Sequence, residues 1–150
     1  MLSPLQKETE TDKEIIQWIN IVLNENNDLN DDLYHLIKDG KKLCQIANKV
    51  IQNPSNKMPH KLTAPYFIME NIEYFINAVK EVGVPDHYNF LTVDLYEGKD
   101  MRQVKIAIMS FARYCHKKKN SFPLIGPKEA TKSEIKKSMI EIDSFLTDKE

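Results

Sequence analysis

The chain has 150 residues, of which 41% are hydrophobic and 29% charged, with a formal net charge of −1. This size fits a single domain, and this balance excludes a chain that is disordered along most of its length. The sequence contains no run of about 18 apolar residues that would span a membrane, and its first residues lack the apolar stretch of a secretory signal.

The first half of the chain predicts three helices joined by polar loops. Residues 12–23 carry apolar side chains at the i, i+3, i+4, i+7 spacing of an amphipathic helix, with Trp18 inside the stripe. A short helix follows, and Gly40 suits the left-handed conformation that would end it. The next helix carries Leu43 on its apolar side and is expected to close before Pro54.

The second half of the chain continues the helical pattern as far as residue 118. Residues 66–82 show the clearest periodicity, with Phe75 in the apolar stripe. A short turn of helix is expected at residues 92–95, and Asp100 is a good N-cap for a helix that carries Phe111 on its buried side. Since no useful length of chain alternates apolar and polar residues, the sequence predicts an all-α fold without a sheet.

The residues after Lys118 predict a basic linker and a further helix. Prolines and a glycine between Asn120 and Pro127 are typical of a linker. Thr131 and Glu134 then fit a capping box. The helix that this box would open aligns four apolar residues: Ile135, Met139, Ile142 and Leu146.

Positive charge gathers in the last third of the chain. Residues 1–100 carry 10 Lys+Arg and 16 Asp+Glu, whereas residues 101–150 carry 11 and 6. On a helix over residues 101–117 the basic side chains would form a second stripe beside the apolar one. This concentration of positive charge would attract an anionic partner. The same pattern is also typical of a helix face that is merely solvated.

Several classes of enzyme and metal site are excluded by the residues present. The four glycines lie far apart, so no glycine-rich phosphate-binding loop can form. The histidines show no metal-binding spacing, and no nucleophile, base and orienting group can be assembled. The two cysteines cannot form a disulfide framework, and Cys44 fits a small core residue. We therefore expect a non-enzymatic cytoplasmic protein without a metal or cofactor.

Three strings of residues resemble a known family. They are Lys38-Asp-Gly-Lys-Lys-Leu-Cys44, the helix Glu70-Asn-Ile-Glu-Tyr-Phe-Ile-Asn-Ala78, and Thr92-Val-Asp-Leu-Tyr-Glu-Gly-Lys-Asp-Met101. Together they resemble the calponin homology domain in its single-copy calponin and transgelin form, over residues 12–118. The resemblance implies a compact bundle of four main helices with short connecting helices, preceded by an extension at 1–11 and followed by the basic segment 119–150. In this fold Trp18, Leu43, Phe75 and Phe111 would be core residues.

The resemblance also implies a function, which is binding to actin filaments in the cytoskeleton, with cross-linking as a further option. The partner would be filamentous actin, bound by a monomer, with no role for nucleic acid. Transgelins and calponins continue into short repeats that bind actin, and residues 119–150 contain no such repeat. The alternative is an adaptor that binds another signalling or cytoskeletal protein. The candidate actin contacts are the basic residues Arg102, Lys105, Arg113, Lys117, Lys118, Lys119, Lys128, Lys132, Lys136 and Lys137.

Overall fold

The computed structural model describes residues 3–51, 61 and 63–125, apart from the side chain of Lys7. Within these ranges every regular element is a helix, which confirms the all-α prediction. The elements are α1 (Pro4–Leu23), α2 (Leu33–Ile37), α3 (Lys41–Val50), α4 (Pro65–Glu81), the 3-10 helix η1 (Asp86–Tyr88), α5 (Thr92–Tyr96) and α6 (Met101–Lys118).

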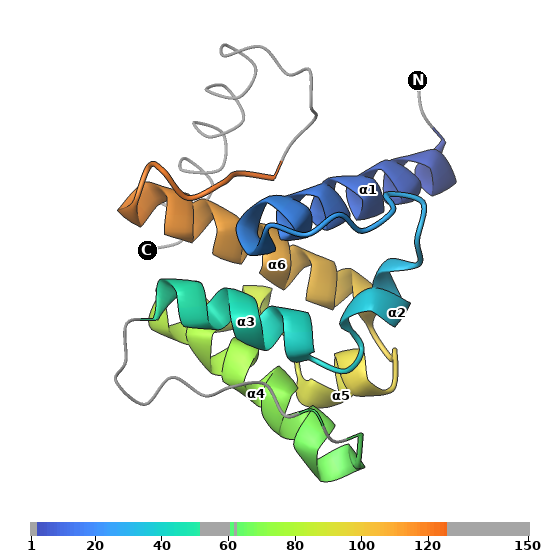
Figure 1. Cartoon of the computed structure of the whole chain (residues 1–150), viewed down its shortest axis with the longest axis vertical. Helices are drawn as coiled ribbons and strands as arrows, with labels where there is room; N and C mark the ends of the chain where they lie inside the picture. The colour runs from blue at the N-terminus through green and yellow to red at the C-terminus, as the bar shows by residue number, and fades with distance from the viewer. Residues whose placement is uncertain (1–2, 52–60, 62, 126–150) are drawn as a thin grey trace.

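Four long helices, α1, α3, α4 and α6, form the bundle, and the short α2 and α5 lie together at one end of it (Figure 1). Helix α1 packs against both α3 and α6, and α3 packs along α4. A ring cluster holds the centre, because Phe111 lies 5.1 Å from Phe75 and 6.5 Å from Trp18 between ring centroids. These three aromatic side chains and Leu43 are all buried. One continuous core therefore joins the four helices.

Helix α1 begins at Pro4, two turns before the start at residue 12 that the apolar stripe predicts. Ser3 accepts a hydrogen bond from the Gln6 backbone N–H, and the Gln6 side chain accepts one from the Ser3 N–H. This capping box, with proline at the first helical position, starts the helix at residues that are not part of the hydrophobic core. Leu5 is 72% exposed, so hydrophobic periodicity gives no sign of these first turns.

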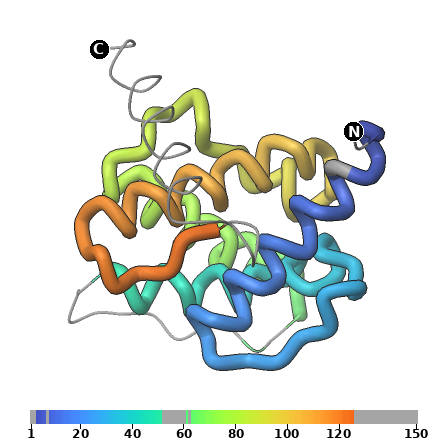
Figure 2. The backbone as a smooth tube through the Cα atoms, turned by 90° about the horizontal axis from the view of Figure 1, so that it is seen from above, coloured from blue at the N-terminus to red at the C-terminus, as the bar shows by residue number. Residues whose placement is uncertain are grey.

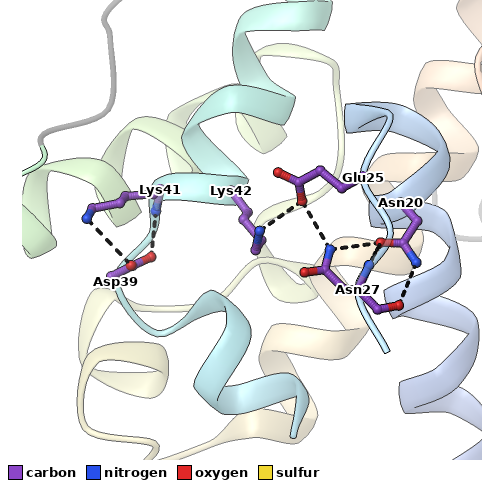
Figure 3. Close-up of polar contacts among 6 residues, drawn as sticks. All are labelled: Asn20, Glu25, Asn27, Asp39, Lys41 and Lys42. Carbon is purple, nitrogen blue, oxygen red and sulfur yellow. Dashed lines mark hydrogen bonds and ion pairs between the residues drawn. The ribbon is translucent and has the colours of Figure 1, made fainter. Parts of the chain in front are cut away.

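A polar network fixes the loop after α1 (Figure 3). The Asn27 backbone N–H donates to the Asn20 side-chain oxygen at 2.9 Å, and the Asn20 amide donates back to the Asn27 carbonyl at 3.0 Å. Glu25 accepts hydrogen bonds from Asn27 and from Lys42 of α3, at 3.1 and 2.8 Å. Burial alone would raise the pKa of Glu25, but these hydrogen bonds lower it. The network joins α1, the loop and α3.

The segment after α6 packs onto the domain, which a linker composition does not predict. The Trp18 indole N–H donates to the Pro123 carbonyl at 3.0 Å, and the Phe122 ring lies 6.2 Å from that of Trp18. His116 Nδ1 donates to the Phe122 carbonyl at 2.8 Å, and Ile125 also packs on the core. The packed part of the chain therefore extends to at least Ile125. The helix predicted from Thr131 lies outside the described residues.

Candidate functional site

Helix α6 has a buried side and a charged side, as its sequence predicts. The Asp100 carboxylate accepts from the Gln103 N–H at 3.1 Å and caps the helix. Val104, Ile108 and Phe111 are fully buried against the rest of the bundle. The remaining side carries the basic residues that are candidates for binding an anionic partner.

The first two candidates differ in their surroundings. Arg102 is exposed in the first turn of α6. Lys105 is only 19% exposed, and its Nζ lies 2.7 Å from the Asp12 carboxylate of α1. Lys105 is therefore not openly solvated, because α1 places an acidic side chain directly against it. A filament that bound this ammonium would have to compete with Asp12.

Arg113 also differs from a solvated cation. Its side chain is half-buried, and this burial lowers the pKa of its guanidinium. A half-buried charge at this position interacts more strongly with an incoming anion than a surface charge does, because water screens it less. It also means that reversing this charge would cost the domain free energy of folding.

The densest exposed charge lies where α6 ends. Lys117 and Lys118 occupy the last turn of the helix and Lys119 is its C-cap, and all three are exposed. Cations at a helix C-terminus are favoured by the helix dipole, so they cost the fold nothing. Arg102 lies about 24 Å away along α6, given 1.5 Å per residue. The four remaining candidates, Lys128, Lys132, Lys136 and Lys137, lie outside the described residues.

The two cysteines are buried in the core. Burial raises the pKa of the Cys115 thiol to about 12, so almost none of it is thiolate near neutral pH. We expect Cys115 of the native protein to react with iodoacetamide at pH 8 about a thousandfold more slowly than Cys115 of the unfolded chain. Mass spectrometry of native and denatured samples measures this, and rapid labelling of Cys115 in the native protein would contradict it. Within the described ranges, no three His, Cys, Asp or Glu side chains gather as metal ligands.

Within the described residues, the fold is an all-helical domain of four main helices and three short ones. The family model for the calponin homology (CH) domain matches residues 9–117. The chain therefore belongs to the calponin homology domain family, which confirms the resemblance seen in the sequence. Among the described residues, no helix is long and apolar enough to cross a bilayer.

Relatives and solved structures agree with this assignment. The chain is 33% identical to myophilin from Echinococcus granulosus over 129 residues, which cover 85% of this chain and 68% of myophilin. It is 34% identical to a transgelin from Saccharomyces cerevisiae over 106 residues, covering 67% of this chain and 53% of that protein. The crystal structure of the calponin homology domain of Rng2 from Schizosaccharomyces pombe superposes with a TM-score of 0.70 at 17% identity, over 92% of this chain and 89% of that one, and supports the fold.

Proposed function

We propose that this protein is a non-enzymatic cytoskeletal protein of the cytoplasm that binds actin filaments through the exposed cations of α6 and the basic segment after it. The observation that carries this proposal is the exposed lysine cluster Lys117, Lys118 and Lys119 at the end of α6. An actin filament is acidic, and an exposed cluster of cations attracts it by long-range electrostatics. Similarity to a transgelin supports a cytoskeletal partner.

The test is a charge reversal at two exposed positions of α6 and at its C-cap. In the variant Arg102→Glu, Lys118→Glu, Lys119→Glu, folding should change little, since surface substitutions usually cost under about 0.5 kcal/mol each. Three reversals at the edge of an interface should lower the affinity for filaments about tenfold or more. Co-sedimentation with actin filaments, with circular dichroism as the folding check, measures both. Lys105 and Arg113 are left unchanged because both contribute to folding.

The matched control reverses three exposed lysines elsewhere, Lys38, Lys49 and Lys80, none of which lies on α6. It changes the net charge by the same amount, so it separates a contact made by α6 from attraction that depends only on the net charge of the protein. Equal losses in the two variants would show that α6 is not the contact. Binding of the parent should also weaken as salt rises. If the parent fails to sediment even at low salt, the chain is instead an adaptor for another protein.

The contribution of the tail lysines is tested by truncation after Pro127. A fragment of residues 1–127 keeps Phe122 and Pro123 on Trp18, which truncation after residue 119 would remove. The fragment loses Lys128, Lys132, Lys136 and Lys137, together with Lys149 and six acidic residues, so its net charge barely changes. If the four lysines contact the filament directly, the fragment should bind several-fold more weakly. Equal binding by the fragment and the full chain would remove the tail from the contact. Low-speed pelleting of filaments tests cross-linking with the same samples.

A further inference from the structure

The segment after α6, residues 119–125, is bonded both to the end of α6 and to α1. It leaves α6 at the lysine cluster and turns back to run to α1 (Figures 1 and 2). The Phe122 N–H donates to the Lys119 carbonyl at 2.9 Å, which closes a turn directly after the helix. The Pro123 carbonyl accepts from the Trp18 indole N–H at 3.0 Å. The end of α6 is therefore tied back to α1 by the chain that follows it.

A histidine of α6 binds the same segment a second time. His116 Nδ1 donates to the Phe122 carbonyl at 2.8 Å. Residues 116–122 therefore form a loop whose two ends are joined by a hydrogen bond. The Lys119 N–H within this loop also donates to the Cys115 carbonyl of the helix, at 2.9 Å. The whole lysine cluster lies inside the closed loop.

This closure bears on binding because the cluster lies at a helix end. The last four carbonyls of a helix have no partner within the helix, and helix ends fray unless other contacts hold them. Backbone that becomes ordered only on binding loses conformational entropy at that moment, which lowers the affinity. The His116 hydrogen bond and the packing of Phe122 on Trp18 order this backbone beforehand.

We propose that the segment 119–125 positions the lysine cluster for the filament, with His116 and Phe122 as positioning residues; this inference rests on the proposed actin contact. His116 closes the loop that carries the cluster, and Phe122 attaches that loop to Trp18. The charges attract the filament from a distance, and the fixed geometry of the loop slows its release. Loss of either positioning residue therefore weakens binding although every lysine is still present.

The first measurement uses the full chain without filaments. Trp18 is the one tryptophan in the sequence, so its indole N–H gives a single signal in a nitrogen–proton correlation spectrum. In His116→Ala, hydrogen exchange of this N–H and of the Lys118 and Lys119 amides should be about two- to tenfold faster, the factor that one hydrogen bond contributes to an equilibrium constant. His116→Asn should restore the rates of the parent, because the asparagine amide provides an N–H donor close to the position of Nδ1.

The second measurement is co-sedimentation of the same variants with actin filaments. His116→Ala and Phe122→Ala should each lower the affinity about threefold or more at unchanged net charge, with circular dichroism as the folding check. His116→Asn should again match the parent. The matched control is Phe67→Ala, a half-buried phenylalanine in the first turn of α4, which lies away from the end of α6 in Figure 1. It should change neither the affinity nor the exchange of the cluster amides.

The positioning role is overturned if His116→Ala leaves either the exchange of the cluster amides or the affinity for filaments as in the parent. An equal loss of affinity in Phe67→Ala would also overturn it, because the loss would then follow from general destabilisation. Failure of the parent chain to bind filaments is a different result. It would refute the proposed actin contact itself, and the positioning role with it.

Discussion

Trp18→Ala should destabilise the domain by about 3–5 kcal/mol, the usual range for truncating a large buried aromatic side chain. Trp18 is 1% exposed, and its ring packs edge-to-face (T-shaped) against Phe111 and Phe122. The substitution therefore empties a site that joins α1, α6 and the segment after α6. Thermal unfolding followed by circular dichroism should show a melting temperature lower by at least about 10 °C.

The matched control is Ile21→Ala on the same helix, where the side chain is 53% exposed and the cost should stay within about 1 kcal/mol. Trp18→Phe separates the two roles of the indole. It keeps much of the packing but removes the hydrogen bond to the Pro123 carbonyl, and should cost about 1–3 kcal/mol. Equal melting temperatures for Trp18→Ala and the parent would show that this side chain does not hold the core.

Gly40→Ala should destabilise the domain by about 2–5 kcal/mol, for two separate reasons. The backbone of Gly40 is left-handed, with φ of +72°, a conformation that costs a residue with a Cβ about 1–2 kcal/mol. An added Cβ would also lie 2.8 Å from the Asn71 Cβ and 2.9 Å from the Ile72 backbone nitrogen. Relieving this overlap forces α3 and α4 apart, and overpacking of this kind costs about 1–3 kcal/mol.

Gly83→Ala is the control that separates these two causes. Gly83 also has a positive φ, of +103°, but an added Cβ would meet nothing nearer than the Tyr114 ring at 3.9 Å. This variant should therefore lose only the free energy of the backbone strain, without a steric overlap. It should be clearly more stable than Gly40→Ala. Chemical denaturation of both variants measures the difference in the free energy of unfolding. Equal losses would mean that the close approach of Gly40 to α4 contributes nothing.

The sequence alone predicts the helices and the core of this protein well, because both follow from a local pattern. A helix repeats every 3.6 residues, so an apolar stripe shows which side is buried without any knowledge of its partner. Phe75 and Phe111 are buried as their stripes predict, and Asp100 caps α6 as predicted. The start of α1 is missed because its capping box acts without an apolar stripe.

The candidate site depends instead on contacts between residues far apart in the chain. Lys105 and Arg113 belong to the basic stripe, but only the tertiary structure pairs Lys105 with Asp12 and half-buries Arg113. The packing of Pro123 on Trp18 spans more than a hundred residues in the same way. The sequence therefore determined the helical class, the core and the family of this protein. The tertiary structure decided which cations remain exposed. The exposure of a charged side chain depends on which other helices lie near it, and a local sequence pattern does not contain that information.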